Sequence, residues 1–249
     1  MGFSMSIQKT KKNPMELLAP AGDWDSLIAA ITAGADAVYL GGKLFNARQN
    51  AANFDRQQLR EATDLLHLHG KKIYVTVNTL SGEAELEEAL KYLGFLHNLG
   101  VDAIIVQDLG LIQLSQKYLP GLELHASTQM TVHNLEGAVF LKDLGIKRVV
   151  LARELAKAEV AEIVAHSGVE IEIFIHGALC ISYSGQCLMS SMIGGRSGNR
   201  GRCAQPCRME YQLGRDRQEI IPAKGSYLLS PKDLTLIAEI PELDRIGVT

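Results

Sequence analysis

The chain has 249 residues, of which 47% are hydrophobic and 21% charged, and its net charge at pH 7 is −3. This composition indicates one large α/β domain or two small ones, and it excludes a protein that coats nucleic acid through overall positive charge. The chain lacks an apolar run of about 18 residues and an apolar secretory stretch near its start, so we expect a cytoplasmic protein without membrane contact.

A repeating unit of helix, glycine and strand follows a leader at 1–14, which we expect to be flexible. Apolar, β-branched runs predict seven strands, near 16–20, 36–41, 72–78, 102–107, 122–127, 148–152 and 171–176. Five of these runs follow a glycine that suits the left-handed position after a helix, namely Gly34, Gly70, Gly100, Gly145 and Gly168. Amphipathic stretches such as 54–69 and 84–99 predict the helices between them.

The regular alternation favours a TIM-like (β/α)8 barrel. An open doubly wound sheet is the alternative, but no GxGxxG motif follows the first predicted strand. An eighth strand is missing from the series, because residues 243–249 repeat the step from helix through glycine to strand and the sequence then stops. We therefore expect an incomplete barrel over 15–249, truncated before strand eight, with a cysteine-rich loop at 180–208.

Polar residues collect where the predicted strands end, which is where (β/α)8 barrels carry their catalytic groups. The catalytic candidates at these positions are His125, Gln129, Arg153, Glu154 and His176. Candidates for binding substrate are Asn78, Asp108 and, in the loop after the second strand, Arg48. A single strand-end histidine is more often structural, and Arg153 with Glu154 equally suits a structural ion pair. The shared position of the set nevertheless predicts a ligand-binding mouth.

All four cysteines of the chain fall in one window. Cys180, Cys187, Cys203 and Cys207 follow the spacing C-x6-C-x15-C-x3-C. In a reducing cytosol such clustering indicates metal or redox chemistry rather than disulfides. The spacing fits a [4Fe–4S] cluster, a zinc site or a reactive thiol, and it does not decide among the three.

The same window contains a basic, glycine-rich stretch at 194–208 with no acidic residue. Its arginines are Arg196, Arg200, Arg202 and Arg208. Guanidinium groups and exposed backbone N–H groups bind phosphates or carboxylates, so these arginines are further substrate-binding candidates. They would also offset the negative charge of a cluster held by four thiolates.

The segment EIEIFIHGALCISYSGQCLMSS, at 170–191, resembles the signature of peptidase family U32. The resemblance extends to ELLAPAGD, GADAVYLGG, YVTVNT and HASTQMTVHN, and it covers residues 16–249. It implies two activities, because some members are described as proteases or collagenases and others hydroxylate a tRNA uridine, a 23S ribosomal RNA cytidine or the ubiquinone ring without oxygen. In the hydroxylating members four cysteines hold a [4Fe–4S] cluster, which implies this role for the four cysteines here. Prephenate is implied as the hydroxyl source.

We therefore predict an iron–sulfur enzyme that hydroxylates an RNA base, in rRNA or tRNA, or a comparable ring. The basic stretch and the signature are most similar to the ribosomal RNA branch. RNA and a small carboxylate are the expected partners. A peptidase that uses Cys180 and His176 is one alternative, although HExxH and GxSxG motifs are absent from the sequence. A noncatalytic RNA-binding protein with a structural cluster is another.

Overall fold

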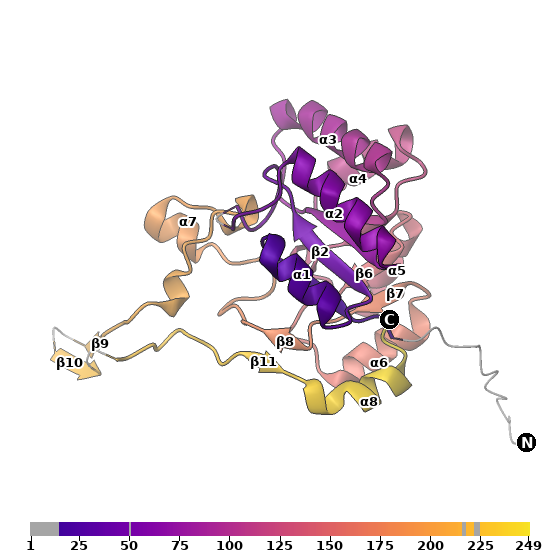
Figure 1. Cartoon of the computed structure of the whole chain (residues 1–249). Helices are drawn as coiled ribbons and strands as arrows, with labels where there is room; N and C mark the ends of the chain where they lie inside the picture. The colour runs from indigo at the N-terminus through magenta and orange to yellow at the C-terminus, as the bar shows by residue number, and fades with distance from the viewer. Residues whose placement is uncertain (1–14, 50, 216–217, 222–224) are drawn as a thin grey trace, which may run out of the picture.

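The computed structural model describes residues 15–49, 51–215, 218–221 and 225–249. Seven parallel strands form one curled sheet, in which each strand pairs with the next one along the chain (Figure 1). They are β1 (Leu18–Ala21), β2 (Ala37–Gly41), β3 (Lys72–Val77), β4 (Ala103–Val106), β5 (Leu124–Ala126), β6 (Arg148–Val150) and β7 (Glu170–Glu172). The predicted TIM-like fold is confirmed, as a curled sheet of seven parallel strands.

Six helices connect successive strands and pack on the outside of the curled sheet (Figure 1). They are α1 (Trp24–Thr32), α2 (Arg56–Leu68), α3 (Leu86–Leu99), α4 (Leu109–Tyr118), α5 (Leu135–Asp143) and α6 (Lys157–His166). Four of them begin after an Asp or Asn whose side chain accepts a hydrogen bond from the backbone N–H three residues later. The five glycines predicted after helices all have φ between 64° and 87°, as a left-handed position requires.

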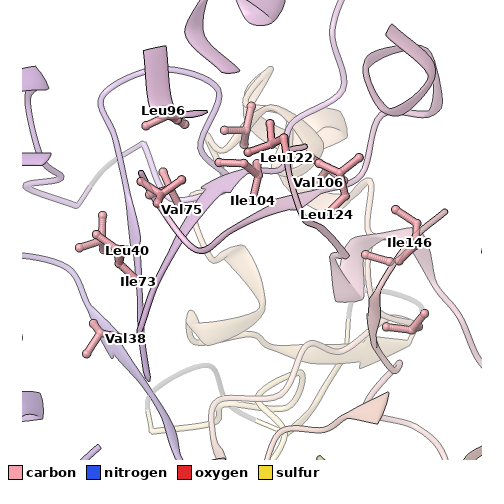
Figure 2. Close-up of a cluster of buried hydrophobic side chains, with 14 of the residues drawn as sticks. Val38, Leu40, Ile73, Val75, Leu96, Ile104, Val106, Leu122, Leu124 and Ile146 are labelled. Carbon is pink, nitrogen blue, oxygen red and sulfur yellow. The ribbon is translucent and has the colours of Figure 1, made fainter. Parts of the chain in front are cut away.

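Alternate strand residues face the helices on one side and the barrel interior on the other. Val38, Leu40, Ile73 and Val75 lie in the layer between strands and helices (Figure 2), and each is at most 1% exposed. Burying a side chain of this size contributes about 2 kcal/mol to stability. The inner face carries a smaller buried cluster of Ala37, Tyr74, Ala103 and Ile105, with Tyr39 packed against it. The buried Arg148 contacts the ring of Tyr74 on this face.

The chain ends beside β7. After α8 (Ile240–Ile246), Gly247 has φ 107°, and the backbone N–H of Thr249 donates to the carbonyl oxygen of Ile171 at 2.9 Å. Residues 243–249 therefore make the predicted step from helix through glycine to the edge of the sheet. No helix in the described part of the chain is long and apolar enough to cross a membrane. The predicted leader at 1–14 lies outside the described residues.

The seventh strand is shorter than predicted. It ends at Glu172, and the next paired segment, β8 (His176–Gly177), is antiparallel to β11 (Leu234–Thr235) rather than part of the main sheet. Gly177 has φ 125°, a conformation that takes the chain out of a regular strand. The sequence predicted that His176 ends the seventh strand, and this prediction is wrong. A further antiparallel pair, β9 (Leu213–Arg215) and β10 (Gln218–Ile221), projects from the barrel (Figure 1).

Candidate functional site

The cysteine loop, residues 180–208, includes the short helix α7 (Met189–Gly194) and contacts the carboxyl ends of the strands (Figure 1). The backbone N–H of Gln49, after β2, donates to the carbonyl of Gly201 at 3.1 Å. The N–H of Leu80, after β3, donates to the carbonyl of Asn199 at 3.3 Å. Backbone bonds thus join the loop to two separate segments of the rim.

Two glycines of the loop touch the rim so closely that a side chain would not fit. A Cβ on Gly185 would lie 2.1 Å from the carbonyl oxygen of Gln129, and a Cβ on Gly201 would lie 2.1 Å from that of Asn46. Both glycines also have positive φ, 77° and 73°. The sequence must therefore place glycine at both points for the loop to reach this position.

Arg153 and Glu154, which follow β6, each bind the cysteine loop or the segment leading into it. One carboxylate oxygen of Glu154 accepts hydrogen bonds from the backbone N–H and the hydroxyl of Ser184, at 3.0 and 3.1 Å. The Nη1 of Arg153 donates to the carbonyl of Ala178, and its guanidinium lies 3.9 Å from the ring centre of Phe174. Arg153 and Glu154 therefore position the loop through separate hydrogen bonds.

Cys180, Arg48 and Tyr39 all lie close enough to Arg153 for their charges to affect it. Burial lowers the pKa of Arg153, the thiol of Cys180 opposes that effect, and the positive charge of Arg48 adds to it. Burial raises the pKa of Tyr39, and the charges of Arg48 and Arg153 oppose that rise. The Nε of Arg153 is buried and has no hydrogen-bond partner among the described residues. Tyr39 was not among the predicted site residues. It lies on the inner face because it alternates in β2 with Val38 and Leu40, which face the helices.

The four cysteines are free and share one electrostatic environment. Burial raises the pKa of the Cys180 thiol, Arg153 opposes this, and the other three cysteines each raise it further. The backbone N–H of Gln205 donates to the Sγ of Cys203 at 3.3 Å. Cys180 and Cys203 are exposed, whereas Cys187 and Cys207 are half-buried. Within the described ranges, no three side chains of His, Cys, Asp or Glu are close enough together to hold a metal ion.

Two of the predicted substrate-binding residues make structural bonds instead. Asp108 caps α4 by accepting from the backbone N–H of Leu111 at 2.8 Å, and its second oxygen accepts from the N–H of Ser81 at 3.1 Å. Arg200 forms a two-pronged ion pair with Glu85, with N–O distances of 2.5 and 2.7 Å. Both residues therefore hold the rim and the cysteine loop in place.

Arg208 and Asn78 are also engaged with the protein. Arg208 donates to the hydroxyl of Ser230 at 2.6 Å and to the carbonyl of Leu179 at 3.0 Å. Asn78, at the end of β3, accepts from the backbone N–H of Ala47 at 3.0 Å and donates to a serine hydroxyl after β5 at 3.3 Å. Asn78 lies at the rim as predicted, where it ties two strand ends together.

His125 lies inside the barrel rather than at its rim. It is fully buried, its Nε2 is 3.0 Å from the carboxylate of Glu123, and its ring packs edge-on against Tyr74. Glu123 precedes β5, so this contact directs the imidazole toward the amino end of the strand. Burial lowers the pKa of His125 and Glu123 opposes that effect. The sequence prediction placed His125 at the end of its strand, but His125 is the middle residue of the three-residue strand β5, and its side chain points into the barrel.

The remaining candidates line the mouth or face outward. Arg48, Arg196 and Arg202 are exposed, and so is His176. Gln129, after β5, is half-buried, and its Oε1 is buried without a hydrogen-bond partner among the described residues. Judged by the described residues, the candidates left to bind a ligand are therefore the exposed arginines, His176, Gln129 and the cysteines, together with the Nε donor of Arg153.

The chain is similar to several known proteins. Residues 22–249 match the model of peptidase family U32. The 23S rRNA 5-hydroxycytidine synthase of Escherichia coli (strain K12) is 44% identical over 234 residues, which cover 94% of the chain and 35% of that relative. The tRNA hydroxylation protein P1 of Bacillus subtilis (strain 168) is 40% identical over 238 residues, covering 94% of the chain and 56% of the relative.

Among solved structures, that of the U32 peptidase Mk0906 aligns with a TM-score of 0.56 and 17% identity, over 71% of the chain and 75% of that structure. This likeness supports the fold. The chain spans only 35% and 56% of the length of these two curated relatives. Because the family model covers nearly the whole chain, the chain belongs to peptidase family U32.

Proposed function

We propose that the chain provides the cluster-bearing barrel of an enzyme that hydroxylates an RNA base, in ribosomal or transfer RNA, without oxygen. The observation that supports this proposal best is the position of the cysteine loop, which is hydrogen-bonded to the rim and has the thiol of Cys180 near Arg153. The similarity to proteins named for hydroxylation of rRNA and tRNA supports it. A barrel rim is also where this fold places its chemistry.

The type of ligand in the loop, rather than the spacing of the four thiols in this structure, supports a [4Fe–4S] cluster. Four thiols are the ligands that such clusters take, and an N–H donor to a thiolate sulfur, as from Gln205 to Cys203, tunes cluster potential. The positive charge of Arg153 near Cys180 would offset part of the negative charge of the ligands. When bound, the cluster would supply electron transfer or a coordination site for substrate. Zinc remains the alternative metal for this ligand set.

Arg48, Arg153 and Tyr39 are suited to bind a small carboxylate. Two guanidinium groups close enough to affect the same tyrosine create a site that favours an anion. The buried Nε of Arg153 lacks an acceptor among the described residues, and an unmet buried donor costs about 1–3 kcal/mol. A carboxylate would accept that hydrogen bond. We propose a carboxylate-bearing hydroxyl donor, of which prephenate is the candidate that the family resemblance supplies.

Arg196 and Arg202 are suited to hold RNA. Both are exposed on the cysteine loop, unlike Arg200 and Arg208, which bind the protein itself. Phosphate contacts of this kind position a nucleic acid without reading its sequence. RNA bound here would therefore pass across the rim beside the cysteines.

The proposal is tested in a strain that lacks the gene. Mass spectrometry of its ribosomal and transfer RNA should show a base lighter by one oxygen, and the wild-type gene should restore the mass. Cys207→Ser should fail to restore it, because a cluster needs all four ligands. Met192→Ser is the matched control, since Met192 is 82% exposed on the same loop, and it should restore the modification.

Two results would overturn the proposal. Unchanged RNA in the deletion strain, together with His176-dependent cleavage of a protein substrate by Cys207→Ser, would support the peptidase. Unchanged RNA with a cluster present and RNA bound would support a noncatalytic RNA-binding protein.

A further inference from the structure

An open cavity of about 430 Å³ lies at the rim between the cysteine loop and the segments that follow β3, β4 and β5. This volume is in the range of small-molecule sites. The residues that line it are Leu80, Gln107, Asp108, Leu109, Gly110, Gln129, Met130, Gly185, Gln186 and Asn199.

Carboxamide side chains dominate the polar part of this lining. Gln107 is 7% exposed, and its Nε2 makes a long bond of 3.4 Å to the carbonyl of Asn199. The Oε1 of Gln129 is buried and has no hydrogen-bond partner among the described residues. Gln186 and Asn199 add two further amide residues from the cysteine loop, of which Gln186 already donates to the hydroxyl of Thr131 at 2.8 Å. The cavity therefore offers both donors and acceptors, of which one is an unmet buried acceptor.

The free groups of the cavity carry no charge. Asp108 is the charged residue of its lining, and both of its oxygens already accept backbone hydrogen bonds. Leu80, Leu109 and Met130 provide apolar surface. Neutral amides beside apolar side chains do not favour a phosphate or a carboxylate, whereas they suit a flat, neutral ring with amide-like edges.

The cavity adjoins the cysteines and the exposed arginines. Gln186 immediately precedes Cys187. Asn199 follows Gly198, and a Cβ added to Gly198 would lie 3.8 Å from the Cβ of Cys203. Arg202 is exposed three residues after Asn199. A flat ring in the cavity would thus lie close to cationic side chains that suit the phosphates on either side of it.

We propose that this cavity binds one unstacked nucleobase of the RNA, with Gln107 and Gln129 reading its hydrogen-bonding edge. The inference rests on the proposed function and deepens it, because it assigns the base to a site separate from the Arg48 and Arg153 carboxylate site. Enzymes that act on a base take it out of the stack and bind it in a pocket through its edge and its faces.

The test compares two short, end-labelled, single-stranded oligoribonucleotides, one with a central cytidine and one with an abasic site at that position. Fluorescence anisotropy with the full chain should show tighter binding of the cytidine oligonucleotide, on the order of ten-fold. Gln107→Leu and Gln129→Leu should each reduce this preference while leaving affinity for the abasic oligonucleotide unchanged. Gln113→Leu, an exposed position on the adjoining α4, should keep the preference.

Gln129→Glu provides a second variant with almost the same shape, and it should also lose the preference because it replaces an uncharged amide of the cavity by a carboxylate. Retention of the full preference by Gln107→Leu, Gln129→Leu and Gln129→Glu would overturn the inference. So would equal binding of the two oligonucleotides by the wild-type chain, although the proposed function would survive that result. If the wild-type chain bound neither oligonucleotide, the RNA substrate itself would be refuted.

Discussion

Among the residues that the structure describes, the two ends of the barrel differ in whether they contain exposed arginines without an ion pair. At the amino end, Arg148 is 3% exposed and bonds to Glu16 at 2.6 Å and to Glu170 at 3.0 Å. At the carboxyl end, Arg48 and Arg202 are exposed, and within the described residues neither forms an ion pair. The amino end is thus a network closed on itself, whereas the carboxyl end keeps charge available for a ligand.

The carboxylates of the amino end differ among themselves. Burial raises the pKa of Glu16, but hydrogen bonds from Arg148, Lys72 and Tyr74 outweigh it and lower that pKa to about 2. Burial raises the pKa of Glu172 to about 7, since its nearest contact with Arg148 is a longer 3.7 Å. Arg148 therefore stabilises the ionised form of the nearer Glu16 more strongly than that of the farther Glu172.

Removing the buried arginine should have the largest effect. Arg148→Met removes the buried arginine that bonds to both Glu16 and Glu170, although Lys72 and Tyr74 remain bonded to Glu16. We expect a loss of about 3–5 kcal/mol of unfolding free energy. Arg153→Met should lose clearly less, because it breaks one hydrogen bond to a carbonyl and a ring contact. Denaturant unfolding of both variants measures the difference. Equal losses would show that the two ends are not organised differently.

Changes at the contact between the cysteine loop and the rim should have the next largest effect on stability. Gly195→Ala strains a left-handed position with open space around it, at about 1–2 kcal/mol. Gly185→Ala has the same strain and adds a clash with backbone, for about 1–3 kcal/mol more. Limited proteolysis should then cut the loop in Gly185→Ala and spare it in Gly195→Ala. Similar protection of both loops would mean that Gly185 does not maintain this contact.

The pH dependence of stability tests Glu172. Because its pKa is raised from 4.5 to about 7 in the folded chain, the folded state binds a proton more tightly, so this group's contribution is full below pH 4.5 and is lost as pH rises through 7. Glu172→Gln removes that loss and should stabilise the chain at pH 8 by on the order of 3 kcal/mol. It should have little effect at pH 4.5. Thermal unfolding at both pH values is the measurement, and an equal effect at both would refute the raised pKa.

The exposed ion pair between Arg200 and Glu85 should matter least for unfolding. Both side chains are more than a third exposed, so solvent screens their attraction. Arg200→Gln should leave the unfolding midpoint nearly unchanged, while hydrogen exchange near Asn199 becomes faster because the loop loses a tether. A large drop in the midpoint would show that this pair is part of the stabilising core.

Local patterns in the sequence predicted the barrel well. The five glycines predicted after helices occupy left-handed positions, and the strand runs lie where β-branched residues gather. These features depend on neighbouring residues, so a single sequence shows them. The end of β7 was predicted too late because the apolar run continues past Glu172, while pairing with β11 depends on residues far along the chain.

The candidate site was harder to predict, because a residue type does not show which partner it takes. Asp108 was expected to bind substrate, but its position immediately before α4 makes it a helix cap. Arg200 has the same loop context as Arg202, yet a distant glutamate pairs with one and not the other. Gly185 and Gly201 passed unnoticed, because close approach of two backbones leaves no pattern in one sequence.

Iron and sulfide analysis of the anaerobically purified full chain tests whether the four cysteines hold a cluster. We expect about four iron and four sulfide per chain, as one cubane contains, and the loss of both in Cys203→Ser. Stoichiometric zinc without sulfide, or a chain that binds no metal yet keeps its activity, would contradict the assignment of the four cysteines to a cluster.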